Sequence, residues 1–217
     1  MPQFTHILFD LDGTLTNPRL GIGNSLKYAL RQMQIDGYSD AILERFVGPP
    51  LQDGFKNLFG LNERNTRLAV EHFRTYFGEK GLYEKEPYAG INELLEELSR
   101  SGKHIYVVTS KLEKYAQMII RHFEFDRYLD GLIGAEASGA HSGKGQLISN
   151  LMVRNRISAS SSVVMVGDTH YDLIGAQENE ISGIAVTYGF GTPETLKSCN
   201  PDYLAESVDE LTELLLS

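Results

Sequence analysis

The stretch "HILFDLDGTLTNPR", residues 6–19, decides the fold of this chain. An apolar run begins at Ile7 and predicts a buried strand over residues 7–11. That strand runs into two acids, Asp10 and Asp12, which a glycine and a threonine follow at once. Two like charges at the end of a buried strand repel each other, so this pattern indicates a site that holds a cation rather than an ordinary strand end.

The bulk composition is that of a soluble globular protein. The chain has 217 residues, of which 41% are hydrophobic and 23% charged, enough to bury a full core. Its net charge of −9 argues against a nucleic acid polymer or an anionic membrane surface as partner. Cys199 is the single cysteine, so neither an internal disulfide nor a cysteine metal cluster is expected.

The sequence shows no targeting or membrane signal. The first residues lack a basic region followed by an apolar segment. No apolar run approaches the roughly 20 residues that a membrane span needs. We therefore expect a cytoplasmic protein, and the sequence leaves both a monomer and a homodimer open.

Strand and helix patterns alternate through most of the chain. Short β-branched runs predict strands at residues 7–11, 105–108, 163–166 and 184–186, with weaker candidates at 132–133 and 202–207. Helical periodicity lies between them, at residues 91–98, 147–151 and 207–215. This alternation predicts an α/β fold with a doubly wound, mostly parallel sheet, a Rossmann-like core.

One region interrupts the alternation. From residue 16 to residue 82 only helical patterns are found, such as the apolar face of Ile22, Leu26 and Leu30. We expect an all-helical insertion over residues 16–82 within a core formed by residues 1–15 and 83–217.

Unusual polar residues follow the predicted strands. Ligands bind beyond the carboxyl ends of the strands of an open parallel sheet, so these positions should converge. They are Asp10 and Asp12, Thr109 and Ser110, Asp168 with Asp172 four residues on, and Lys144 before a helix expected near residue 146. Ser110 and Glu113 also match a capping box, which predicts a helix N-terminus suited to phosphate directly after the second strand.

This set of side chains has a chemical logic. Mg²⁺ prefers a few carboxylates, water and a phosphate oxygen, and it would let clustered acids stay ionised. Asp10 would then act as a nucleophile on phosphorus, while Asp12 protonates the leaving oxygen and later takes a proton from water. Lys144 and the Thr109 hydroxyl would offset charge on the phosphoryl oxygens.

Four segments resemble the haloacid dehalogenase-like superfamily, whose members are mostly phosphatases. "DLDGTLT" resembles its first motif, "VVTS" its second and "GDTHYD" its fourth, and Lys144 stands where the third-motif lysine falls. "FVGPPL" and "VTYGFGTPETL" are further similar to the phosphoglycolate phosphatase branch, which includes 5′-nucleotidases. Lys144 is followed by glycine where many members have proline.

The resemblance implies a role for each residue. Asp10 and Asp12 would be catalytic and, with Asp168, would be ligands of Mg²⁺, Asp12 through its backbone carbonyl. Asp172 would complete the metal site from nearby or through water. The phosphate-binding residues would be Gly13, Thr14, Thr109, Ser110 and Lys144. The helical insertion would be a mobile cap over the site. The implied function is Mg²⁺-dependent hydrolysis of a small phosphate ester through an aspartyl-phosphate.

Other functions are weighed against this one. A dehalogenase is disfavoured, because carbon–halogen displacement does not need the acid/base that Asp12 supplies. A phosphomutase would use the same residues and stays open, and a non-catalytic phospho-acceptor module would be shorter and would lack the insertion. "SGAHSGKG" at 138–145 misses two positions of a phosphate-binding P-loop, and "GIGNSL" and "GFGTPE" lack the third glycine of a dinucleotide fingerprint, so both are expected to be turns.

Overall fold

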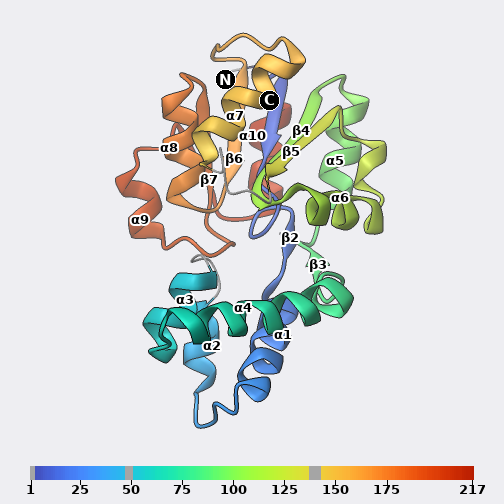
Figure 1. The fold of residues 1–217 in the computed structure, drawn as a ribbon. Coiled ribbons are helices and arrows are strands. Elements are labelled where there is room, and N and C mark those ends of the chain that lie inside the picture. Colours follow the sequence, from blue (N-terminus) through green and yellow to red (C-terminus); the bar gives the residue numbers. More distant parts are fainter. Residues whose placement is uncertain (1–2, 47–50, 137–142) are drawn as a thin grey trace. The chain divides into compact units, whose positions relative to one another are not determined.

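The computed structural model describes residues 3–46, 51–136 and 143–217 (Figure 1). The chain forms two compact units, one from Met1–Asn17 and Pro87–Ser217 and the other from Pro18–Glu86. Among the described residues, no helix has the length and apolar character that crossing a membrane requires.

The first unit is built on a six-stranded parallel sheet, which confirms the predicted α/β fold. The strand order is β5-β4-β1-β6-β7-β8. The strands are β1 (His6–Phe9), β4 (His104–Leu112), β5 (Gly131–Ala135), β6 (Val163–Gly167), β7 (Ser182–Val186) and β8 (Tyr203–Ala205). Both weak strand candidates are thus real edge strands.

The order of the strands creates a switch point beside β1. From β1 the chain passes to β4 on one side, and from β6 it passes to β7 on the other. Phe9 of β1 pairs with Val107 of β4 and with Val166 of β6. Ligand sites of doubly wound folds lie at such a switch point, beyond the carboxyl ends of the strands.

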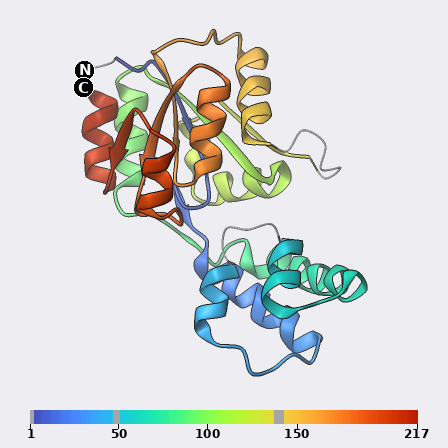
Figure 2. The same cartoon turned by 90° about the vertical axis from the view of Figure 1, so that its left-hand side faces the viewer.

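Helices cover both faces of this sheet, as Figure 2 shows. Contacts join α7 to α8 over β4, β5, β6 and β7, and α5 to α10 on the opposite face. The helices of this unit are α5 (Ile91–Arg100), α6 (Glu113–His122), the 3₁₀ turn η2 (Phe125–Arg127), α7 (Lys144–Asn155), α8 (His170–Glu178), α9 (Pro193–Ser198) and α10 (Val208–Leu216).

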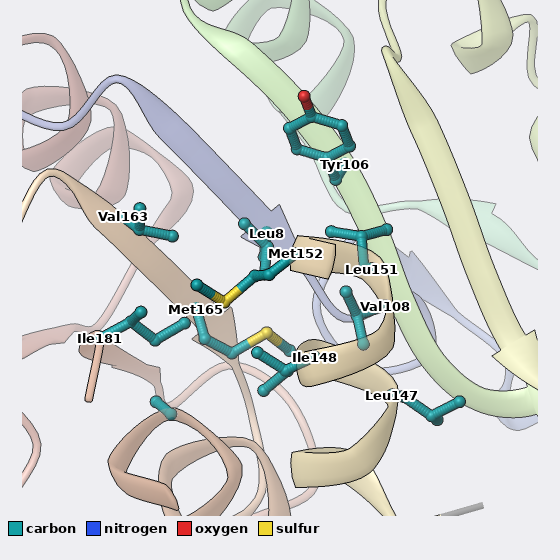
Figure 3. Packing of buried hydrophobic residues seen from close by; sticks show 11 residues of the cluster. Leu8, Tyr106, Val108, Leu147, Ile148, Leu151, Met152, Val163, Met165 and Ile181 are labelled. Atoms are coloured by element: carbon teal, nitrogen blue, oxygen red, sulfur yellow. The ribbon is translucent and has the colours of Figure 1, made fainter. Parts of the chain in front are cut away.

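The period of two along each strand sends alternate side chains to opposite faces. Leu8 and Met165 point toward α7, where they pack with Ile148, Leu151 and Met152 in one buried cluster (Figure 3). Burial on both faces explains why these strands are continuously apolar in sequence. The resulting core fixes the sheet edge on which the polar residues stand.

The second unit is helical and has its own core. Its elements are α1 (Arg19–Gln32), α2 (Asp40–Phe46), α3 (Leu51–Phe59), α4 (Glu63–Tyr76) and the π-helix η1 (Phe77–Gly81). Phe46, Phe55 and Phe73 are buried and in ring contact, with centroids 4.9–6.5 Å apart. Such aromatic packing allows this unit to hold its own fold.

A short ladder lies where the chain leaves and re-enters the first unit. β2 (Thr16–Asn17) and β3 (Glu86–Pro87) form a two-stranded sheet. An all-helical segment was expected over residues 16–82, and β2 shows that this prediction was wrong at its first two residues. Two residues carry no periodic signal, and their partner lies 70 positions away, so local pattern could not reveal this pairing.

Three expectations about boundaries are wrong. β1 ends at Phe9, so Leu11 is outside the strand, and α7 begins at Lys144 itself. Ser110 does not cap a helix, because β4 continues to Leu112 and Leu112 precedes α6 with no side-chain cap. Glu113 instead accepts a hydrogen bond from the Gly134 N–H at 3.2 Å. Ser207 caps α10, since its side chain accepts a hydrogen bond from the Glu210 N–H.

Candidate active site

Three aspartates from three segments meet beyond β1 and β6. Asp10, Asp168 and Asp172 each offer an oxygen, and these atoms lie within 4.8 Å of one another. Asp10 is 7% exposed, and the other two are fully buried. The Asp10 N–H donates to the Val166 carbonyl at 2.9 Å, which continues the β1–β6 pairing into the site. The register of the two strands therefore aligns the first and fourth sequence motifs.

Lys144 lies among these carboxylates, at the first residue of α7. Its Nζ is 2.7 Å from Oδ1 of Asp10 and 2.8 Å from Oδ1 of Asp172. The same ammonium donates to the Val108 carbonyl at 3.0 Å. The lysine side chain is 4% exposed, so its charge is neutralised by the protein rather than by water.

Burial and crowding shift the proton affinities of this cluster. Burial raises the pKa of Asp10 to about 6, because it outweighs the opposing effect of the Lys144 ammonium. Burial, and then the charges of Asp10 and Asp172, raise the pKa of Asp168 to about 8. Burial by itself lowers the pKa of Lys144, but the two facing carboxylates raise it overall.

The residues of the cluster fit a divalent cation. Oδ1 of Asp172 is buried and faces the Lys144 ammonium at 2.8 Å, and no other described residue donates a hydrogen bond to it. Asp12 and the three clustered aspartates make four carboxylates, and Lys144 and Lys111 are the two lysines in contact with them. The formal charges therefore leave an excess of two negative charges. Carboxylate oxygens are the ligands that Mg²⁺ prefers, and one such ion would cancel that excess.

Asp12 stands apart from the three clustered aspartates. Its Oδ2 lies 2.5 Å from Nζ of Lys111, and its Oδ1 accepts a long contact of 3.4 Å from the Thr16 hydroxyl. The side chain of Asp12 is 21% exposed. The sequence analysis did not single out Lys111, because one lysine in a polar segment has no distinctive pattern.

The predicted phosphate-binding residues lie around the same sheet edge, with unequal exposure. Thr109 is buried, and its Oγ1 accepts the Lys111 N–H at 3.2 Å, whereas Ser110 is exposed. Thr14 is fully buried, and its hydroxyl is directed at Oδ1 of Asp168 at 3.4 Å. Gly13 has a φ of +96° and packs directly on Asp168, where a Cβ would lie 2.1 Å from Oδ2. A side chain at position 13 would therefore displace that carboxylate.

The loop after β7 also holds Asp168, which the sequence analysis missed. The Phe190 N–H donates to Oδ2 of Asp168 at 2.8 Å, and the Gly191 N–H donates to its backbone carbonyl at 3.0 Å. A Cβ on Gly189 would lie 2.3 Å from the Cβ of Asp168. The segment "GFGTPE" was expected to be only a turn, and its glycines in fact permit this close approach.

Asp172 is fixed by the residue that precedes α8. Its Oδ2 accepts the Thr169 N–H at 3.0 Å and the Thr169 hydroxyl at 2.7 Å. This leaves Oδ1 to face the cluster. The sequence "GDTHYD" contains this threonine, and a hydroxyl three residues before an acid at a helix start is a signal that could have identified the contact.

Comparisons with known proteins agree with this arrangement. The sequence profile described as "Haloacid dehalogenase-like hydrolase" matches residues 7–186. A 5′-nucleotidase from Pseudomonas aeruginosa is 40% identical over 215 residues, with 99% of this chain and 97% of that protein covered. A phosphoglycolate phosphatase from Vibrio parahaemolyticus is 27% identical, with 96% and 95% covered.

A solved structure is similar throughout. A haloacid dehalogenase-like family hydrolase from Streptococcus pneumoniae superposes with a TM-score of 0.90 at 32% sequence identity, with 99% of each chain covered. The expected enzyme class thus agrees with the names of the relatives. The chain belongs to the haloacid dehalogenase-like hydrolases.

Proposed function

We propose that this hydrolase is a Mg²⁺-dependent phosphatase that acts on a small phosphate monoester through an aspartyl-phosphate on Asp10. The observation that carries the proposal is the buried contact of Asp10 with Lys144, beside Asp168 and Asp172. A buried carboxylate held by an ammonium, next to two further acids, suits nucleophilic attack on a phosphoryl group. The names of the two relatives, 5′-nucleotidase and phosphoglycolate phosphatase, support the same class of substrate.

The reaction has two halves. In the first, a carboxylate oxygen of Asp10 bonds to phosphorus, the ester P–O bond breaks, and Asp12 gives its proton to the leaving oxygen. In the second, water attacks the phosphorus of the aspartyl-phosphate and loses a proton to Asp12. Inorganic phosphate leaves, and the Asp10 carboxylate and the protonated Asp12 are restored.

The remaining residues would bind the phosphoryl group and the cation. Lys144 and the Thr109 hydroxyl would offset charge on the transferring oxygens, and Gly13, Thr14 and Ser110 would complete the phosphate contacts. Asp10, Asp168 and Asp172 would hold Mg²⁺ through their side chains, and Asp12 through its carbonyl. Mg²⁺ would supply positive charge that offsets negative charge on the phosphoryl oxygens and lets the carboxylates stay ionised.

We further propose that the helical unit, Pro18–Glu86, serves as a cap that selects the leaving group. Its insertion directly after the first motif and its separate aromatic core support this role. A cap of this size favours small metabolites over polymers, so nucleoside monophosphates, phosphoglycolate and sugar phosphates are the candidate substrates. The expected place of action is the cytoplasm.

The proposal is tested by phosphate release from a panel of these esters and an aryl phosphate, with Mg²⁺ and with EDTA. We expect turnover only with Mg²⁺, and loss of turnover in Asp10→Asn, which keeps the size of the side chain but removes the nucleophile. Asp209→Asn is the matched control, because Asp209 is exposed on α10. Turnover retained by a folded Asp10→Asn variant would overturn the mechanism.

Two alternatives have distinct outcomes in the same assay. Isomerisation of a sugar phosphate without net phosphate release would identify a phosphomutase. A persistent aspartyl-phosphate without turnover would identify a phospho-acceptor module. Either result would replace the phosphatase proposal.

A further inference from the structure

Lys111 contacts Asp12, the acid of the first motif that is not among the three clustered aspartates. Its Nζ lies 2.5 Å from Oδ2 of Asp12, and its side chain is only 12% exposed. An ion pair on an exposed surface contributes little to stability, but an ion pair that is mostly buried restrains both side chains. The two acids of the first motif thus have separate lysines, Lys144 for Asp10 and Lys111 for Asp12.

A β-bulge in β4 places Lys111 next to Asp12. Thr109 pairs with Gly134 of β5, and the next pair is Leu112 with Ala135. Ser110 and Lys111 therefore form a bulge of β4 between two consecutive β5 residues. Bulges redirect side chains, and they are frequent beside active sites.

The bulge is held by specific contacts on both strands. The Lys111 N–H donates to Oγ1 of Thr109 at 3.2 Å, and Oε2 of Glu113 accepts the Gly134 N–H at 3.2 Å. A Cβ on Gly134 would lie 2.7 Å from the Lys111 carbonyl oxygen and 2.6 Å from the Cα of Glu113. Only glycine at position 134 lets the bulge lie this close to β5.

These contacts connect the bulge to a phosphate-binding residue, Thr109, and to the proposed acid/base, Asp12. Because Oγ1 of Thr109 accepts the Lys111 N–H, its own proton can be donated to a phosphoryl oxygen. The Lys111 ammonium donates to Oδ2 of Asp12, and the Thr16 hydroxyl donates to Oδ1 at 3.4 Å, so each oxygen of this carboxyl group has its own donor.

We propose that Lys111 is a positioning residue, which holds the Asp12 carboxyl group in place so that it delivers its proton to the leaving oxygen. The inference rests on the proposed function and deepens it. Without the ammonium, the Asp12 side chain loses the 2.5 Å contact that fixes its Oδ2, and a misplacement of about 1 Å at a reacting group costs about 10²-fold in rate. The loss should depend on how strongly the leaving group needs a proton.

The test compares two esters by kcat/KM, which reports phosphoryl transfer to Asp10 and excludes the later hydrolysis. One ester is 4-nitrophenyl phosphate, whose leaving phenolate is stable without a proton. The other is a nucleoside 5′-monophosphate, whose leaving alkoxide is not. The variants are Lys111→Met, Lys111→Arg, Gly134→Ala, and the control Lys114→Met, which removes an exposed lysine three residues later.

We expect Lys111→Met to lose about 10²-fold on the nucleotide and less than about tenfold on the aryl ester. Lys111→Arg should keep part of the activity that Lys111→Met loses. Gly134→Ala should show the same selective loss as Lys111→Met, because it displaces the bulge. Lys114→Met should match wild type. The melting temperature of each variant distinguishes a folded from an unfolded chain, and Lys111→Arg and Gly134→Ala provide the same readout if Lys111→Met does not fold.

Two results overturn the inference while the proposed function stands. One is an equal loss on both esters, which means that Lys111 acts on binding or folding alone. The other is no loss beyond that of Lys114→Met. A wild-type chain that is inactive on both esters would overturn the proposed function, and this inference with it.

Discussion

Nζ of Lys144 and Oδ1 of Asp10 lie 2.7 Å apart across 134 positions of sequence, and both side chains are almost fully buried. The contact joins the carboxyl end of the central strand β1 to the first residue of α7. This contact reduces the repulsion between the two acids of the first motif, because Lys144 offsets the charge of Asp10. Lys111 offsets the charge of Asp12 in the same way. A remaining excess of negative charge still favours a cation.

Lys144→Met should destabilise the chain and abolish phosphate release. Removing the ammonium leaves Asp10 and Asp172 buried without it, and breaking a buried ion pair from one side typically costs about 3–5 kcal/mol. Urea unfolding at pH 7.5 in EDTA measures the loss. Lys197→Met, on the exposed side of α9, is the control and should change stability by less than about 0.5 kcal/mol. Equal stability of the two variants would contradict the role of Lys144.

The metal-free chain should become less stable as the pH rises through the site's pKa values. The folded pKa of Asp10, about 6, and that of Asp168, about 8, exceed the ordinary aspartate value of 3.8, so the folded state binds protons more tightly than the unfolded state. The stabilisation is complete below pH 3.8 and is lost as the pH rises through 6 and then 8.

Mg²⁺ should reverse this trend. Because the ion binds ionised carboxylates and displaces protons, its stabilising effect should be larger at pH 8 than at pH 5.5. Thermal unfolding in EDTA and in Mg²⁺ at the two pH values measures both effects. A Mg²⁺ shift that is the same at both values would argue against binding at Asp10 and Asp168.

Gly13→Ala should displace Asp168 and reduce turnover by at least about 10²-fold. The added Cβ would lie 2.1 Å from Oδ2 of Asp168, and the backbone at φ +96° disfavours any side chain. Gly23→Ala is the control, because its Cβ would meet nothing within 4 Å inside α1. The control should keep full activity and gain up to about 1 kcal/mol of stability. Phosphate release and urea unfolding of both variants provide the comparison, and full activity in Gly13→Ala would show that Asp168 tolerates displacement.

Thr169→Ala should weaken Mg²⁺ binding about 10- to 100-fold, because its hydroxyl donates to the Asp172 oxygen that faces away from the cluster. Thr192→Ala removes a comparable N-cap hydroxyl, which accepts the Thr195 N–H before α9. Both variants should lose about 1 kcal/mol of stability, and only the first should require more Mg²⁺ for turnover. Mg²⁺ titration of activity separates them, and equal Mg²⁺ requirements would show that Thr169 acts on helix stability alone.

Much of the fold could be predicted because it depends on local pattern. The apolar runs at 105–108 and 163–166 are central strands, and the edge strand at 203–205 was anticipated as a weak candidate. The positions of Asp10 and Asp168 followed from one rule, that polar residues after parallel strands meet at one sheet edge, whereas Lys144 was expected there because it precedes a helix. That rule needs only the strand ends and the parallel order.

Contacts that depend on register escaped prediction. Ser110 was expected to cap a helix, yet β4 runs past it and bulges toward β5. Gly189 and Gly191 were expected to be only turn residues, and they pack on Asp168 from the loop that follows β7. In each case the local residues are compatible with the simpler structure, and only a distant strand changes the outcome.

The sequence by itself determined the parallel sheet, the two acids at its central strand and the lysine that meets the first of them, because hydrophobic periodicity and strand order depend on local residue type. Only the tertiary structure decided that the two acids pair with different lysines. The bulge that brings Lys111 to Asp12 requires Gly134, 23 positions later, to have no side chain, and such non-local steric fit has no signature in the residues around Lys111.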